Sequence, residues 1–241
     1  MLEELSTMFE AAINRFGKLA VGLYAKLMFR MDVLRHVPLP PGPKIIAPNH
    51  PTTTDPFLLL TITGEPFAIL IEDLMFRVPL FGRYLKWAGH VPVVPENGRA
   101  AFDTGRRLLE NGRSLAIFPE GAISPLDGGF QKARTGAARL ALLTGAPIIP
   151  IGVHVERENI RLIPTEVDGD PALGTWYFRG RYAMTVGEPM YFDGNAEDRD
   201  LVRRVTERMM RRIAQLTDES AQRLAEAQAR AALRAGKLVN I

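Results

Sequence analysis

The sequence predicts an α/β fold, with a mixed, partly parallel central sheet flanked by helices and an N-terminal amphipathic helical segment. Between residues 44 and 153, short apolar segments alternate with helical patterns, which is typical of parallel strands joined by crossover helices. Apolar residues at helical spacing occupy residues 1–35 and recur from residue 196 onward. With 46% hydrophobic and 24% charged residues, the 241-residue chain can bury a full core.

At the N-terminus, residues 1–35 are expected to be helical. Apolar side chains such as Phe16 and Leu23 recur at three- and four-residue spacings, and basic side chains such as Lys18 and Lys26 interrupt the surface that they form. This pattern is typical of a basic amphipathic helix on a membrane, and equally of a helix that covers its own domain. Both hold if one face packs and the other inserts.

A proline-rich connector at residues 38–43 follows, and no helix can continue through it. The chain therefore divides into a membrane-interface helical segment at 1–37, an α/β core at 38–192 and a C-terminal helical region at 193–241. Strands are expected at 44–47, 67–71, 91–94, 115–118, 148–153, 160–163 and 182–186. Helices are expected at 56–63, 79–87, 99–110 and 132–143.

The C-terminal region is expected to form one long helical stretch toward Arg234. Leu201, Val205, Met209 and Ile213 give it an apolar stripe among many arginines. Basic helices of this kind also occur in nucleic-acid binders, but no DNA- or RNA-binding motif accompanies this one. A packed helix with a solvated polar face is the better interpretation, and no nucleic-acid partner is expected.

Composition excludes several classes of chemistry. The chain has no cysteine, so a cysteine nucleophile, a disulfide framework and a thiolate metal site are excluded, and it has only four histidines. The net charge of +3 suits an anionic partner such as a phospholipid surface. No segment provides the about 20 apolar residues needed to cross a bilayer, and no signal-peptide pattern is present. We expect a cytoplasmic protein, peripheral at the inner face of the membrane.

The segment from Ala47 to Pro56 carries the first candidate site. His50 precedes a proline, which favours extended backbone at the end of a strand. Asp55 also precedes a proline, a common helix start, so the loop turns between strand and helix. It can bring both side chains together at the carboxyl end of the strand, where α/β sheets bind ligands. The simpler alternative is that Asp55 caps the helix and His50 lies on the surface.

A histidine in contact with a carboxylate can act as a general base, because the carboxylate fixes the tautomer while the imidazole takes a proton from a hydroxyl. The chain contains neither a Gly-x-Ser-x-Gly nucleophile motif nor a cysteine. The activated hydroxyl is therefore expected to belong to a second substrate, with direct transfer in place of a covalent enzyme intermediate.

A second candidate site follows the apolar strand that ends at Phe118. If this strand is parallel to the first, Glu120 lies at the same sheet edge as His50. Gly121 lets the backbone approach a ligand closely. The alternative is an ordinary turn with an exposed glutamate.

In this order, these segments resemble the lysophosphatidate (1-acylglycerol-3-phosphate) acyltransferase family, the glycerolipid acyltransferases with an H-x-x-x-x-D motif. The resemblance covers about residues 44–153. It rests on the first motif at His50 to Asp55, the third at Phe118-Pro-Glu-Gly121, the fourth at Ala146-Pro-Ile-Ile-Pro150, and a basic-x-Gly helix start at Arg134-Thr-Gly136.

The resemblance implies an enzyme of phospholipid biosynthesis or remodelling. It would transfer a fatty acyl group from acyl-CoA or acyl carrier protein to the hydroxyl of a lysophospholipid-like acceptor. His50 would be the general base and Asp55 its orienting partner, while Glu120 and Gly121 would shape the acceptor site. Pro150 would belong to the apolar wall of the acyl pocket. The resemblance implies no metal and no cofactor besides the acyl donor.

The sequence departs from the family pattern at two arginines. Where the second motif usually closes on arginine, this chain has Pro95, and where the third often continues to Thr-Arg, it has Ile123. The family's arginines are associated with the acceptor's phosphate. Arg99, Lys132 and Arg134 are candidate replacements, and an acceptor with a larger head group is equally open.

Two further functions remain alternatives. In the first, the same base activates water, and the protein hydrolyses an acyl thioester or ester. In the second, the protein binds a lipid surface and its motif residues no longer catalyse.

Overall fold

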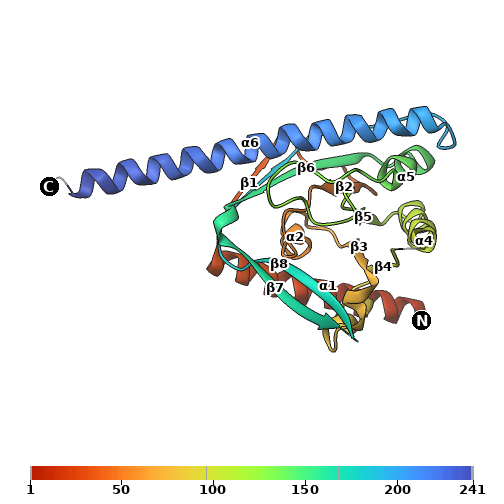
Figure 1. The fold of residues 1–241 in the computed structure, drawn as a ribbon. Helices are drawn as coiled ribbons and strands as arrows, with labels where there is room; N and C mark the ends of the chain where they lie inside the picture. The colour runs from red at the N-terminus through yellow and green to blue at the C-terminus, as the bar shows by residue number, and fades with distance from the viewer. Residues whose placement is uncertain (1, 96, 168, 240–241) are drawn as a thin grey trace.

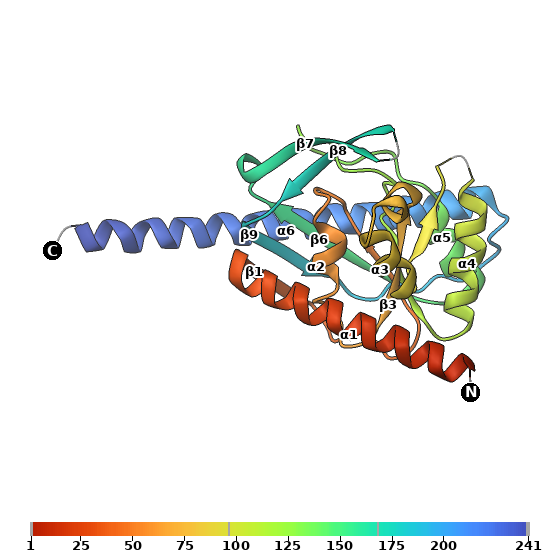
Figure 2. The same ribbon diagram turned by 90° about the horizontal axis from the view of Figure 1, so that it is seen from below.

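The computed structural model describes residues 2–95, 97–167 and 169–239, with side chains described between residues 12 and 233 (Figures 1 and 2). A seven-stranded sheet lies at its centre, in the order β1-β9-β6-β2-β5-β3-β4. Its strands are β1 (Phe29–Arg35), β2 (Ile45–Pro48), β3 (Phe67–Glu72), β4 (Val91–Val93), β5 (Ser114–Ala116), β6 (Ile148–Val155) and β9 (Gly180–Val186). β7 (Ile160–Val167) and β8 (Asp170–Tyr177) form a separate antiparallel pair.

The described strand pairs of the large sheet are parallel, except for the antiparallel pair β6 and β9. The predicted mixed, partly parallel sheet is therefore confirmed. β2 lies between β5 and β6, and its Ile46 pairs with Ala116 of β5 and Ile149 of β6. Because these strands are parallel, their carboxyl ends meet at one sheet edge, where ligands bind in α/β folds.

Helices cover both faces of this sheet (Figures 1 and 2). They are α1 (Leu2–Met28), α2 (Asp55–Leu59), α3 (Phe81–Trp87), α4 (Gly98–Glu110), α5 (Gly136–Thr144) and α6 (Arg199–Val239), with short 3-10 helices η1 (Asp73–Arg77) and η2 (Arg157–Asn159). None of the described helices is both long and apolar enough to cross a membrane.

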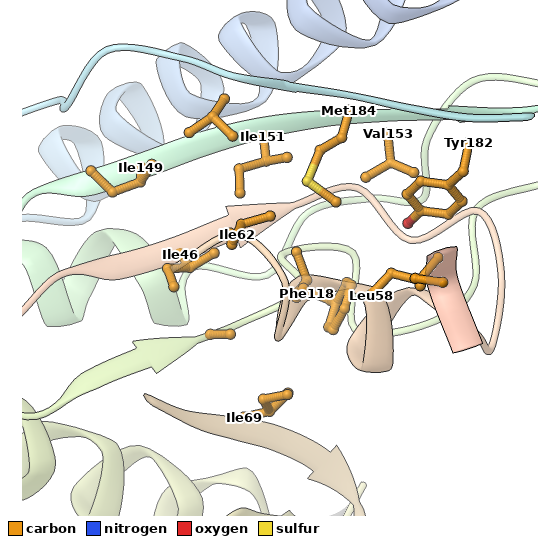
Figure 3. Packing of buried hydrophobic residues seen from close by; sticks show 14 of the residues in the cluster. Ile46, Leu58, Ile62, Ile69, Phe118, Ile149, Ile151, Val153, Tyr182 and Met184 are labelled. Carbon is orange, nitrogen blue, oxygen red and sulfur yellow. The ribbon is translucent and has the colours of Figure 1, made fainter. Parts of the chain in front are cut away.

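Along each central strand, successive side chains point to opposite faces of the sheet. On the face toward α1 and α2, Ile46 and Ile151 pack with Leu58 of α2 (Figure 3). On the other face, Ile45 and Ile148 pack in the cluster that contains side chains of α4, α5 and α6. Both faces of the central strands are thus buried, as is typical of parallel strands.

Two regions differ most from the prediction. The helix expected over residues 1–35 ends at Met28, and Phe29–Arg35 forms β1, an edge strand parallel to β9. Within Phe29–Arg35, apolar residues also alternate with polar ones, as in a strand. This pattern was overlooked because the segment was interpreted as part of the helix. Residues 160–163 do not extend the sheet, because they pair with β8, a strand that the sequence analysis missed. Pro171 and Gly174 within β8 weaken its strand signal.

α6 is one continuous helix that runs along the sheet and extends past the rest of the molecule toward the C-terminus (Figure 1). Its residues Met209, Ile213 and Leu216 are fully buried. At Gly152 of β6, an added Cβ would lie 2.1 Å from the backbone of Leu216, so a side chain there would push the helix away. The apolar stripe of the C-terminal region therefore belongs to the core.

Candidate active site

His50 lies two residues beyond β2, and Asp55 is the first residue of α2. His50 Nδ1 and Asp55 Oδ2 are 3.0 Å apart. Asp55 is fully buried, whereas 16% of the His50 side chain is exposed. The imidazole stacks on the ring of Phe118, beyond β5, with 3.9 Å between the ring centroids. The structure therefore brings the two predicted catalytic residues together and leaves part of the imidazole open to a substrate.

Four hydrogen bonds surround the carboxylate of Asp55. Oδ2 accepts from the backbone N–H of Thr52 at 2.7 Å and faces His50 Nδ1, while Oδ1 accepts from the hydroxyls of Thr52 and Tyr182, both at 2.8 Å. A carboxylate offers about four acceptor positions, so all are occupied. A carboxylate only accepts, so a neutral His50 bonded to it would donate from Nδ1 and leave Nε2 free to accept a proton.

Asp55 does not cap α2, although the sequence left this reading open. Thr54 holds the N-cap position, without a side-chain cap hydrogen bond. The Asp-Pro pair correctly predicts where the helix starts, but the carboxylate turns back toward Thr52 and His50.

The threonines of the first motif attach this loop to β8. Thr53 exchanges two hydrogen bonds with Thr175, from its N–H to the Thr175 carbonyl at 2.8 Å and from the Thr175 N–H to its hydroxyl at 2.9 Å. The hydroxyl of Thr54 donates to the carbonyl of Tyr177 and accepts from its N–H, both at 3.0 Å. The sequence analysis missed these roles because it missed β8.

Glu120 lies at the same sheet edge as His50, as the parallel pairing predicts. Its Oε1 accepts from the N–H of His50 at 3.0 Å and from the hydroxyl of Ser124 at 2.7 Å, and its Oε2 accepts from the N–H of Gln131 at 2.7 Å. The residue is only 3% exposed. These contacts hold the loop between β5 and α5 against the backbone of His50. Sequence reasoning missed Ser124, whose role appears only once the loop is folded.

Gly121 and Arg134 lie together beside this turn. Gly121 has a φ of +65°, a conformation that favours glycine. A Cβ at Gly121 would lie 2.5 Å from Nε of Arg134, so the arginine side chain passes directly over the turn. The backbone N–H of Arg134 donates to the carbonyl of Pro119 at 2.8 Å. Arg134 is exposed and has no ion-pair partner within the described ranges, so a cation lies beside the turn that follows Glu120.

The other two candidate cations lie in different parts of the fold. Lys132 is exposed in the same loop as Arg134. Arg99 is 89% exposed and lies 3.8 Å from Asp103 within α4. α4 follows β4, which is three strand positions from β2, about 14 Å at the usual strand spacing. The structure thus brings Arg134 to the site but does not bring Arg99 there.

Pro150 is buried in β6, between Ile149 and Ile151. Both isoleucines belong to the cluster that contains Phe118, so Pro150 points to the opposite face of the sheet. There its Cγ lies 3.1 Å from the position of a Cβ on Gly187. The side chain of Pro150 therefore lies away from Phe118, on which the His50 ring stacks.

The other histidines have structural surroundings. Burial, and then the charge of Arg113, lowers the pKa of His90 to about 4, and its Nδ1 accepts from the N–H of Ile69 at 3.2 Å. Burial also lowers the pKa of His154. His36 lies 2.9 Å from Glu219 of α6. Within the described part of the chain, no group of three or more His, Asp or Glu side chains is arranged to hold a metal.

Several known acyltransferases are similar in sequence to this chain. The chloroplastic 1-acyl-sn-glycerol-3-phosphate acyltransferase LPAT1 of Arabidopsis thaliana is 28% identical over 135 residues, which is 55% of this chain and 37% of that protein. The 1-acyl-sn-glycerol-3-phosphate acyltransferase of Haemophilus influenzae is 28% identical over 180 residues, which is 72% of this chain and 69% of that protein. The chain spans less than half the length of several such relatives.

The fold has a solved counterpart. The crystal structure of the 1-acyl-sn-glycerophosphate (LPA) acyltransferase PlsC from Thermotoga maritima matches with a TM-score of 0.60 and 22% identity, over 90% of this chain and 83% of that one. An acyltransferase family model matches residues 30–154, just over half of the chain and the part that holds His50, Asp55 and Glu120. The chain therefore belongs to the acyltransferase family, with 1-acyl-sn-glycerol-3-phosphate acyltransferases among its relatives.

Proposed function

We propose that this protein transfers a fatty acyl group from an acyl thioester to the free hydroxyl of a lysophospholipid-type acceptor. The observation that carries the proposal is the His50–Asp55 pair, in which a fully hydrogen-bonded carboxylate orients a partly exposed imidazole. The names of its relatives favour 1-acylglycerol-3-phosphate as the acceptor. Acyl-CoA and acyl carrier protein are the two candidate donors.

In this mechanism, Nε2 of His50 takes the proton of the acceptor hydroxyl as its oxygen attacks the thioester carbonyl. A tetrahedral intermediate forms, the carbon–sulfur bond breaks, and the leaving thiolate takes the proton from the imidazolium. Asp55 keeps Nδ1 protonated and stabilises the positive charge on the ring. The products are the ester and the free thiol, and no covalent enzyme intermediate is required.

Arg134 is the side chain best placed to meet an anionic group of the acceptor. Its guanidinium lies over the Gly121 turn, and this turn adjoins Glu120, which binds the backbone of His50. Arginine binds phosphate through two parallel hydrogen bonds, which suits a phosphomonoester. Lys132, two residues away, would add charge. In this proposal Glu120 holds the backbone of His50 through a hydrogen bond and does not contact the acceptor.

α1 supplies the contact with the membrane in this proposal. The exposed α1 stripe consists of Phe16, Leu19, Leu23 and Leu27, which are 60% to 72% exposed. Such a stripe is typical of a helix that lies in the membrane interface. Next to it, Lys26 and Arg35 help to line an open groove of about 360 Å³ between α1 and β1. With α1 in the membrane interface, these basic side chains would meet phosphate headgroups.

Vesicle flotation tests the membrane contact. We expect the double variant Leu19→Asp/Leu23→Asp to lose binding to vesicles that contain phosphatidylglycerol. These side chains are exposed, so the thermal unfolding temperature should stay close to that of the wild type. Unchanged vesicle binding by the double variant would show that the exposed α1 stripe does not make the membrane contact.

The central experiment follows thiol release and ester formation together, with acyl-CoA and acyl carrier protein as donors. Lysophosphatidate and lysophosphatidylcholine serve as acceptors, and wild type and His50→Ala are compared. We expect ester formation that needs both the acceptor and His50. Thiol release that is independent of the acceptor would indicate a hydrolase, and vesicle binding without turnover of either donor would indicate a binding protein. Either result would overturn the proposal.

A further inference from the structure

We propose that Tyr182 is a positioning residue of this site, because its hydroxyl holds Asp55 so that Oδ2 faces Nδ1 of His50. This inference rests on the proposed acyl transfer. Tyr182 lies on β9, 127 residues beyond Asp55 in the sequence. It is outside the matched family region, which ends at residue 154.

Tyr182 differs from the other donors to Asp55 in where it comes from. The N–H and hydroxyl of Thr52 and the ring of His50 belong to the same loop as Asp55 and would move with it. Tyr182 is the one described donor that reaches the carboxylate from the central sheet, at 2.8 Å from Oδ1. It therefore fixes the rotation of the carboxylate relative to the rigid core, and through it the plane of the imidazole.

The position of the Tyr182 hydroxyl is itself fixed. The backbone of Tyr182 pairs with Met31 of β1 and Val155 of β6, so the residue lies inside the sheet. Its fully buried ring packs edge to face on Phe29, with 6.1 Å between centroids, and lies 6.4 Å from the ring of Tyr177. Figure 3 shows the ring pointing from β9 toward α2.

The phenol stays a donor over the working range of pH. Burial, and then the charge of Asp55, raises the pKa of Tyr182 well above its usual value. The neutral phenol therefore keeps its proton and can donate it to Asp55.

Tyr177 provides a matched control. It is as fully buried as Tyr182 and packs on the same Phe29 ring, with 5.8 Å between centroids. Its hydroxyl donates to the carbonyl of Arg181 at 2.8 Å, and not to Asp55. Tyr177→Phe and Tyr182→Phe thus remove the same atom from neighbouring buried rings, and only the second change removes a donor from Asp55.

The first test compares kcat and KM of both variants with the wild type. A buried hydrogen bond to a charged group corresponds to about a tenfold to hundredfold change in rate. We expect Tyr182→Phe to lower kcat by this factor with KM within about twofold, while Tyr177→Phe keeps the wild-type kcat. In an Asp55→Asn background, Tyr182→Phe should have no further effect, because its role passes through the carboxylate. Wild-type kcat in Tyr182→Phe, or an equal loss in the Asp55→Asn background, would overturn the inference.

A second test does not depend on turnover. NMR of protein with 15N-labelled histidine reports which ring nitrogen of His50 carries the proton. We expect Nδ1–H in the wild type and in Tyr177→Phe, and a changed His50 signal in Tyr182→Phe. An identical His50 signal in all three proteins would contradict the role of Tyr182. A changed signal in a protein that turns over no thioester would support the role of Tyr182 and refute the proposed function alone.

Discussion

The residues assigned to the chemistry and those assigned to the acceptor are held in opposite ways. Asp55 is fully buried and Glu120 is 3% exposed, and the carboxylate of each is enclosed by hydrogen bonds. Arg134 and Lys132 are exposed, and Arg99 is 89% exposed. Buried, fully bonded groups have a single geometry, whereas exposed cations can adapt to different anions. The proposed catalytic groups therefore have a more sharply defined geometry than the proposed acceptor-binding groups.

The largest effect is expected at Asp55. In Asp55→Asn, the amide cannot accept all four hydrogen bonds, and its NH2 group faces a donor. The tautomer of His50 is then no longer fixed, so kcat should fall by about 10³- to 10⁴-fold. Steady-state kinetics measures this, with thermal unfolding as the control for folding. A loss below tenfold in a folded variant would show that the carboxylate does not orient the base.

A smaller effect is expected at Glu120, which acts on the backbone of His50. Glu120→Gln sets an NH2 group against one of its three donors, and should lower the free energy of unfolding by about 1–3 kcal/mol. We expect kcat to fall about tenfold, since 1.4 kcal/mol corresponds to that factor. Ser124→Ala is the control. It removes one donor to Glu120 and the 3.3 Å contact of Ser124 Oγ with the His50 N–H, but leaves the bonds that Glu120 accepts from His50 and Gln131. A KM effect restricted to the acceptor would instead make Glu120 an acceptor-binding residue.

The exposed cations should act on binding alone. Arg134→Gln should raise KM about tenfold for acceptors with a phosphomonoester, because it removes a charge-assisted hydrogen bond. Its kcat and unfolding temperature should stay near those of the wild type. Kinetics with lysophosphatidate, which carries a phosphomonoester, and with a monoacylglycerol, which carries none, shows whether the effect depends on the phosphate. An equal rise in KM for both acceptors would show that Arg134 does not bind the phosphate.

The smallest effect is expected at Arg99, which is about three strands away and paired with Asp103. Arg99→Gln should change KM by less than about twofold, since exposed ion pairs contribute at most about 1 kcal/mol. The same assay as for Arg134 measures it. A rise as large as that in Arg134→Gln would bring α4 into the acceptor site.

Periodicity in the sequence predicted most strands and helices between residues 44 and 153 in chain order, because buried strands and amphipathic helices leave strong local patterns. It correctly indicated a packed helix in the C-terminal region, but left open whether the N-terminal helix packs or lies on a membrane. α1 and α6 each carry an apolar stripe among basic residues, but Met209 and Ile213 of α6 are buried while Leu19 and Leu23 of α1 are exposed. Which stripe packs depends on sheet neighbours that are distant in sequence.

In the candidate site, too, the residues with a local sequence pattern were predicted and those without one were missed. The common sheet edge of His50, Asp55 and Glu120 was predicted because they follow strands that pair in parallel. Glu120 was expected to shape the acceptor site, but its carboxylate is bonded to His50, Ser124 and Gln131. Tyr182 and Ser124 were missed because their partners depend on long-range pairing that leaves no local pattern. Pro150 was expected in the acyl pocket, but its side chain points away from Phe118, on which His50 stacks, as strand alternation requires.

The most direct test of the central claim is identification of the product by mass spectrometry. Wild type and His50→Ala are incubated with an acyl thioester and 1-acylglycerol-3-phosphate under the same conditions. We expect a diacylated product from the wild type and about 10²- to 10⁴-fold less from His50→Ala. Equal amounts of diacylated product from both proteins would contradict it.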